Sequence, residues 1–201
     1  MILKTDSYET KLGALEEEYK ILRAVPTEKT LAKIMDGRRA SKFPIKKLDT
    51  EPDVFRTKDS PYEQEHREDL QKLLERNPRK ELDPVTAVHV ELERFVLVDG
   101  HARLAAYKAA GRKTIPVQFF DGPPKEALLY GIEANSKTTR STTKTERMNH
   151  AWRLVRLGTY SKADIVKSTQ VSDGQVAIMR RVMRIIEDKD IRVPKKEHGL
   201  F

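Results

Sequence analysis

Apolar residues at helical spacing open the chain, and two short apolar runs follow near its middle. Residues 8–24 repeat leucine and tyrosine every three or four positions, which predicts an amphipathic helix that ends before Pro26. The runs 85–90 and 95–98 are rich in β-branched residues and predict strands. The short charged segment 91–94 between them favours a β-hairpin.

Shorter patterns complete this first part of the chain. They predict a weak helix over 28–35, a strand over 43–48, a helix from Pro61 to Asn77, a helix over 102–110, a strand over 115–120 and a helix over 125–135. Because proline cannot donate to a strand ladder, Pro116 favours an edge position for its strand. We therefore predict a helical arm over 1–40 and a small mixed α+β domain over 41–136.

Residues 137–201 show only helical patterns and are expected to form an all-α domain. Thr143 or Thr145 is placed to cap a helix that ends at Leu157, and Trp152 lies on its apolar face, so we assign this tryptophan to the core. The polar segment 136–146 is expected to connect the two domains.

Two capping boxes eleven residues apart follow this helix. Ser161–Asp164 and Ser172–Gln175 each predict the start of a helix, with apolar residues spaced so that the two helices pack across a turn. This spacing is typical of a DNA-binding helix-turn-helix over 161–186, and a plain helical hairpin is the alternative. Gln170 stands in the turn, where many such motifs have glycine.

Charge distribution favours the DNA-binding interpretation. The formal net charge is +8, yet residues 1–136 contain 24 basic and 24 acidic side chains, whereas 137–201 contain 15 and 7. A basic segment beside a neutral one is typical of a protein that binds a polyanion. The residues expected to meet DNA lie on the second helix of the pair and are Ser172, Asp173, Gly174, Gln175, Ile178, Arg180, Arg181 and Arg184.

Composition also excludes some classes of protein. The chain has no cysteine, which excludes disulfides and thiolate metal sites. No apolar run is long enough to span a bilayer, so we expect a cytoplasmic protein that makes no membrane contact.

The segment VDGHAR, residues 98–103, is the candidate for chemistry in the first domain. A strand that ends in Asp-Gly and leads directly into a helix directs backbone N–H groups and the helix dipole toward the turn, where an anion is stabilised. Gly100 allows close approach of a ligand, and Arg103 could donate to a phosphate. The pattern alone leaves an anion site and a simple capped turn as alternatives.

The order of elements around this segment resembles the ParB/sulfiredoxin-type domain. VDGHARLAAYKAAGRKTIPVQFF stands where that family has its Gly-Glu-Arg-Arg-x-Arg-Ala box, and the segment from Ile45 to Arg56 resembles the family's opening strand and Pro-Phe-x-x-Arg segment. The resemblance covers about 42–185. His101 replaces the glutamate of the box, and Ala102 and Ala105 stand where the family has two further arginines.

The resemblance implies a function and a set of site residues. It implies a ParB-like DNA-binding protein of plasmid or chromosome partition or related regulation, with double-stranded DNA, a second copy as homodimer and a partition ATPase as partners. CTP or ATP with Mg²⁺ would be the cofactor. The nucleotide or phosphate site implied by the family's motifs comprises Gly100, His101, Arg103, Glu133 and Asn135.

Two alternatives remain open at this point. The first is an enzyme of the same fold, a metal-dependent nuclease or a nucleotide-hydrolysing (CTPase or ATPase) protein, with Asp99 and His101 as catalytic residues. The second is an interaction protein whose active surface is the arm at 8–24.

Overall fold

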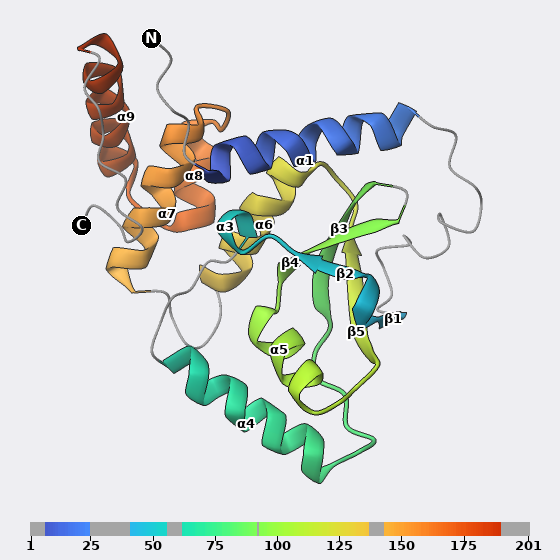
Figure 1. The fold of residues 1–201 in the computed structure, drawn as a ribbon. Coiled ribbons are helices and arrows are strands. Elements are labelled where there is room, and N and C mark those ends of the chain that lie inside the picture. The colour runs from blue at the N-terminus through green and yellow to red at the C-terminus, as the bar shows by residue number, and fades with distance from the viewer. Residues whose placement is uncertain (1–6, 25–40, 56–61, 92, 137–142, 190–201) are drawn as a thin grey trace. The chain divides into compact units, whose positions relative to one another are not determined.

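The computed structural model describes residues 7–24, 41–55, 62–91, 93–136 and 143–189 (Figure 1). The chain divides into two compact units, and helices α1 (Ser7–Ala24) and α6 (Pro124–Ser136) each contribute to both. One unit, Lys11–Leu128, contains the β-sheet. The other, Met1–Thr10 with Leu129–Phe201, is helical in its described residues. The helix expected over 28–35 lies outside the described residues.

Five strands form one mixed sheet in the first unit. They are β1 (Ser41–Pro44), β2 (Leu48–Thr50), β3 (Val85–Glu91), β4 (Arg94–Asp99) and β5 (Thr114–Phe120), in the order β1-β5-β3-β4-β2. β3 and β4 form the antiparallel hairpin predicted from the sequence. β5 lies parallel to β3 and antiparallel to β1, and β2 lies parallel to β4.

The first extended segment differs from its prediction. Residues 43–48 do not form one strand, because the 3-10 turn η1 (Ile45–Lys47) separates β1 from β2 and moves the chain from one edge of the sheet to the other. A short α-helix, α3 (Pro52–Phe55), follows β2 and buries Val54 and Phe55.

The edge position expected for the strand with Pro116 was wrong, because β5 lies between β1 and β3. The register explains why proline is tolerated there. Pairing of β5 with β3 begins only at Val117, so at Pro116 the strand has a single neighbour, Lys42 of β1. A missing N–H therefore costs no bond on the β3 side.

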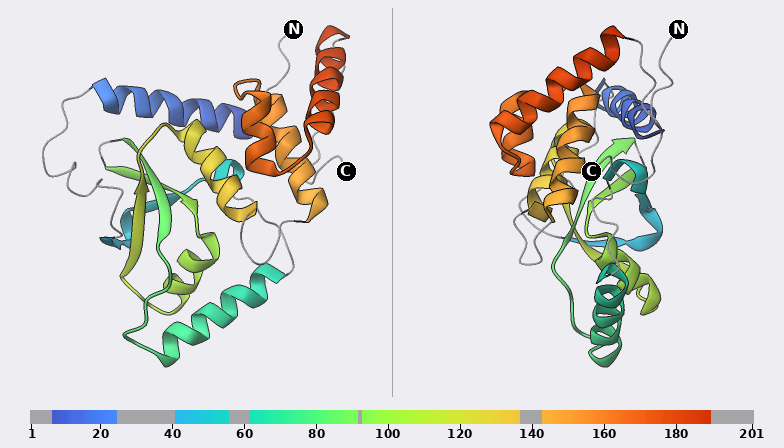
Figure 2. Two further views of the ribbon diagram at one scale, coloured as in Figure 1. Left: turned by 180° about the vertical axis from the view of Figure 1, so that it is seen from behind. Right: turned by 90° about the vertical axis from the view of Figure 1, so that its left-hand side faces the viewer.

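Strand β3 is covered on both faces, since even its polar residues Thr86 and His89 are buried. All residues from Val85 to Val90 are buried. On one face, α5 (His101–Ala109) packs on β3 and β5, and α4 (Tyr62–Arg76) packs on α5 (Figures 1 and 2). The core of the sheet contains an edge-to-face aromatic pair, Phe43 and Phe95, with ring centroids 4.9 Å apart. His89 stacks on Phe95 at 4.4 Å as part of the core.

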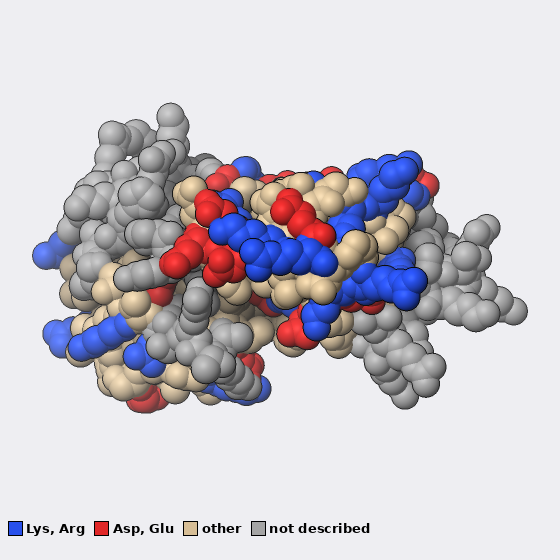
Figure 3. Space-filling model, turned by 90° about the horizontal axis from the view of Figure 1, so that it is seen from below, with Lys and Arg blue, Asp and Glu red and all other residues tan. Residues whose placement is uncertain are grey.

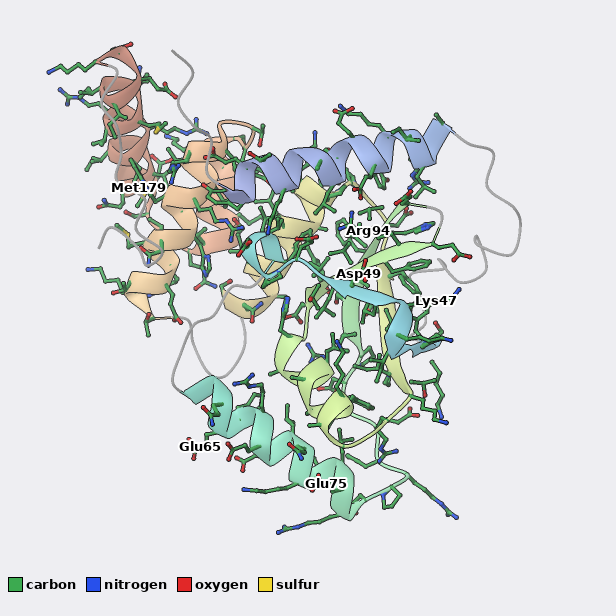
Figure 4. The ribbon with its side chains drawn as sticks, in the orientation of Figure 1. Lys47, Asp49, Glu65, Glu75, Arg94 and Met179 are labelled. Carbon is green, nitrogen blue, oxygen red and sulfur yellow. The ribbon has the colours of Figure 1, made fainter. Side chains whose placement is uncertain are left out.

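Helix α1 is attached to the sheet by an ion-pair network around Arg94. Within the Lys11–Leu128 unit, its guanidinium donates to Glu18 of α1 at 2.6 Å and to Glu51 at 2.8 Å. Partial burial alone would lower the pKa of Arg94, but the surrounding carboxylates raise it above its ordinary value. Figure 4 labels Arg94 beside Asp49, the third carboxylate that it contacts, at 3.3 Å.

Three helices follow in the second unit: α7 (Lys144–Leu157), α8 (Lys162–Thr169) and α9 (Asp173–Asp188). They pack on one another in pairs. Thr143 begins α7 with a reciprocal capping box to Glu146, and Gly158 ends it in the left-handed region. Trp152 is buried, as assigned from its helix face. The first turn of α1 packs on α7, where Tyr8 lies under the Arg153 guanidinium at 4.4 Å.

Among the described residues, no helix combines the length and the apolar character that crossing a membrane requires.

A substitution at Met179 measures how much the packing of α9 contributes to stability. Replacing its buried side chain by alanine (Met179→Ala) leaves a cavity, and we expect the free energy of unfolding to fall by about 2–5 kcal/mol. Met183→Ala is the matched control, because Met183 is only half-buried on the same helix and its loss should cost roughly 1 kcal/mol. Urea unfolding of the full chain gives both values, and equal losses would contradict the packing described here.

Candidate nucleic-acid interface and anion site

The turn between β4 and α5 is held by the left-handed conformation of Gly100. Its φ is +99°, and its carbonyl accepts the Leu104 N–H at 2.9 Å as the first helical bond. A Cβ at this position would lie 2.6 Å from Val85 Cγ1, closer than real carbon atoms approach. Glycine is therefore required at position 100 by both backbone conformation and space.

Arg103 is bound within the protein. One terminal nitrogen donates to Asp99 Oδ2 at 2.7 Å, and the other donates to the carbonyls of Asp83 and Pro84. The side chain thus ties the start of α5 to the segment that enters β3. Arg103 could bind an anion at the turn only after breaking these hydrogen bonds. Otherwise the anion would be bound by other groups.

The first backbone amides of α5 remain the strongest anion-binding feature of this turn. Gly100, the N-cap residue, has no side chain with which to cap them, and the start of a helix attracts an anion. His101 is half-buried at the first position of the helix. Asp99, Gly100, His101 and Arg103 lie together at this turn because they are neighbours in the sequence.

Glu133 and Asn135, the remaining residues of the implied nucleotide site, lie on α6 in the second unit. The Glu133 carboxylate lies 3.9 Å from Lys167 Nζ. The Asn135 side-chain amide donates to the Gly131 carbonyl at 2.8 Å. Within the described part of the chain, no group of three or more His, Asp or Glu side chains could hold a metal ion.

Helices α8 and α9 are joined by a tight turn of three residues. Gln170 takes the left-handed conformation, with φ +57°, and donates its N–H to the Val166 carbonyl at 2.9 Å. A residue with a Cβ adopts this conformation less readily than glycine, so the turn is strained at one residue. The Thr169 hydroxyl donates to Ile165 O and accepts the Val171 N–H, which closes the turn from inside.

Caps at both helix starts confirm the boundaries predicted for this pair. Ser161 and Asp164 form a full capping box at α8. At α9, the Ser172 hydroxyl accepts the Gln175 N–H at 3.4 Å. Of the five apolar residues expected at the crossing, four are buried and Val166 is half-buried; the buried ones are Ile165, Val171, Val176 and Met179.

This packing decides which residues of α9 reach solvent. Ser172, Asp173 and Gly174 are exposed, Gln175 is half-buried, and Ile178 is 56% exposed, which is unusual for isoleucine. Lys162 at the start of α8 pairs with Asp173 at 2.8 Å, an interaction that no sequence motif indicated.

The three arginines of α9 are not equivalent. Arg180 is half-buried and donates to the Tyr160 carbonyl at 2.7 Å, so it joins α9 to the segment before α8. Arg181 and Arg184 are exposed. Of the arginines that the sequence assigned to DNA, these two present their guanidinium groups to solvent.

The known proteins to which this chain is similar are solved structures. No family model matches the chain, and no curated protein matches its sequence. Among solved structures, the chain is similar to the chromosome-partitioning protein ParB from Caulobacter crescentus complexed to the centromeric parS site, with 22% identity over 71% of each chain and a TM-score of 0.46. The same protein complexed with CTP-gamma-S matches at 22% identity, over 72% of this chain and 78% of that one, with a TM-score of 0.41.

A Pnob8-like ParB-N domain is also similar, with 16% identity over 77% of this chain and 75% of that one and a TM-score of 0.48.

Gly100→Ala tests the constraint at the turn. Left-handed backbone and overlap with Val85 together should lower the free energy of unfolding by about 2–5 kcal/mol. The control is Gly111→Ala, where φ is also positive, at +68°, but nothing lies within 4 Å of the added carbon, so only about 1–2 kcal/mol should be lost. Thermal and urea unfolding measure both, and a smaller loss at position 100 than at 111 would refute the steric argument.

Proposed function

We propose that this chain is a ParB-like DNA-binding protein whose α8–α9 pair docks on duplex DNA as a helix-turn-helix. The observation that supports this best is the exposed first turn of α9. Val176 and Met179 are buried, and the same packing leaves Ser172, Asp173 and Gly174 in solvent at the end of the helix that enters a major groove in this motif.

Charge in this unit favours contact with the phosphate backbone. The excess of basic residues in the chain lies entirely within 137–201. Arg181 and Arg184 are exposed about two and three turns beyond the start of α9, where a side chain can reach phosphate while the first turn meets bases. Such contacts release counterions, so binding should be strongly salt-dependent.

The first turn of α9 also carries groups that distinguish bases. Gln175 can pair with the N6 and N7 edge of adenine, and Asp173 can accept from the N4 amino group of cytosine. Ile178 is exposed and can contact a thymine methyl group. A Cβ added to Gly174 would meet nothing within 4 Å, so this position leaves room for close approach to DNA.

Partition of a plasmid or chromosome, a homodimer and a partition ATPase as partner belong to this proposal through the sequence resemblance. The matched structures with parS and with CTP-gamma-S concern other proteins. Homodimers are common among proteins with this motif, because two half-sites on DNA are then read by two copies.

A nucleotide or phosphate at 99–103, with CTP or ATP and Mg²⁺ as the expected ligand, is a second and separate proposal. The observation in its favour is that the N-cap residue of α5 is Gly100 in the left-handed conformation, which leaves no side chain between a ligand and the start of the helix. Such a ligand would meet backbone amides first, since Arg103 is bound to Asp99 and to two carbonyls.

Arg181→Ala tests the backbone contact. Duplex DNA should bind more weakly at every sequence, and the slope of log K against log salt should fall by about one unit. Arg76→Ala is the control, because Arg76 is an equally exposed arginine at the end of a helix in the other unit. Fluorescence anisotropy across a salt series measures both slopes. An unchanged slope for Arg181→Ala, or equal changes in both variants, would exclude the proposed contact.

Asp173→Asn tests base readout. The change removes one negative charge next to DNA, so overall affinity should rise. The preference for cytosine at one position should disappear, because a carboxylate only accepts hydrogen bonds whereas an amide also donates them. Asp188→Asn makes the same change at the opposite, exposed end of α9 and should leave base preference unchanged. Selection from a random duplex pool reads the preference. Identical selected sequences for wild type and Asp173→Asn would contradict readout by this residue.

A further inference from the structure

A hollow of about 780 Å³ lies at the C-terminal end of α5, in the Lys11–Leu128 unit. One wall is the chain from Pro44 to Glu51, and the other is the segment from Lys108 to Thr114 that leads from α5 into β5. The Ile45 N–H donates to the Lys113 carbonyl at 3.0 Å, which holds the two walls together. The hollow is therefore formed by two backbone segments that are hydrogen-bonded to each other.

Three lysines on these walls have no ion pair with any described residue. Lys46, Lys108 and Lys113 are exposed and line the hollow. Elsewhere lysines do find carboxylates, as Lys42 does with Glu81 at 2.8 Å and Lys20 with Glu17 at 2.6 Å. Three ammonium groups without ion-pair partners among the described residues therefore lie around the hollow.

The same walls also carry two carboxylates, Asp49 and Glu51. Asp49 and Glu51 both accept from Arg94, at 3.3 Å and 2.8 Å, on the side of β2 that binds α1. Arg94 also pairs with Glu18, so its single charge offsets only part of theirs. The lining of the hollow still carries four basic side chains against these two acidic ones.

A fixed guanidinium adds to the positive charge. Arg112 lines the hollow and donates to the carbonyls of Leu74, Asn77 and Pro78, all at the end of α4. Carbonyl dipoles hold the group in place but leave its full charge uncancelled. On the face drawn in Figure 3, blue basic side chains gather on the right of the view, whereas red and blue alternate at its centre.

We propose that this hollow binds a small anion that carries several phosphate groups. Ammonium groups bind phosphate as point charges, and three of them around a fixed guanidinium suit a polyphosphate better than a single carboxylate. The hydroxyls of Thr50 and Thr114 supply further donors. Its volume lies within the range of small-molecule sites, so a molecule of nucleotide size fits.

The site differs from the turn at 99–103. The nine residues of α5 separate the two, which at 1.5 Å per residue is about 13 Å. The hollow has lysines without carboxylate partners, whereas the turn has an arginine engaged by Asp99. Binding here is independent of DNA binding by α9, so each proposal can fail without the other.

Isothermal titration of the full chain with inorganic triphosphate and with CTP, at low salt, tests the proposal. The double variant Lys108→Gln/Lys113→Gln should bind triphosphate about tenfold or more weakly than wild type, because two charges next to the ligand are lost. Both side chains are exposed, so folding is expected to be retained. The control is Lys72→Gln/Lys80→Gln, which removes two exposed lysines of the same unit that do not line the hollow and should bind as wild type does.

Two further titrations complete the experiment: triphosphate into the Arg103→Lys variant, and a short duplex DNA into the wild type and the double variants. Triphosphate affinity that falls in the Lys108/Lys113 variant and stays unchanged in the Lys72/Lys80 control supports the hollow. Affinity that falls only in Arg103→Lys would place the ligand at the turn and overturn the proposal. Absence of binding by the wild type at millimolar ligand, equal losses in both double variants, or a Lys108/Lys113 effect on duplex DNA alone would also overturn it.

Discussion

Burial of Val176 and Met179 against α7 and α8 is the constraint on which the proposed function depends. When a helix buries one face against its neighbours, the opposite face lies in solvent. In α9 the buried face is the one that carries Val176 and Met179. Because the caps fix where α9 begins, the rotation of the helix and its starting point are both determined. The exposure of Ser172, Asp173 and Gly174 at the start of α9 then follows from packing within the unit.

The same logic accounts for the different uses of charge in the chain. Arg94, Arg103 and Arg112 are engaged by carboxylates or carbonyls and serve the fold. Arg181 and Arg184 on α9 have exposed side chains, as do the lysines of the hollow. A basic residue with fixed partners contributes to structure, and one in solvent is available to an anion. Counting charges along the sequence cannot separate these two groups.

Local features of the structure could be predicted from sequence, since they depend on neighbours within a few residues. The caps at Thr143, Ser161 and Ser172 are of this kind, and so is the β3–β4 hairpin. Contacts between distant segments could not be predicted. The partners of Arg103 include Asp83, twenty residues earlier, and the walls of the hollow meet only because β1 pairs with β5. The position of Pro116 was wrong for the same reason, because strand order depends on the whole sheet.

The most direct test of the central claim is a titration of isotope-labelled full-length protein with duplex DNA, followed by backbone amide chemical shifts. The account predicts that the largest changes fall on the first turn of α9, from Ser172 to Ile178, with smaller changes near Arg181 and Arg184. Changes confined to the sheet-containing unit, or none on α9 at saturating DNA, would contradict it.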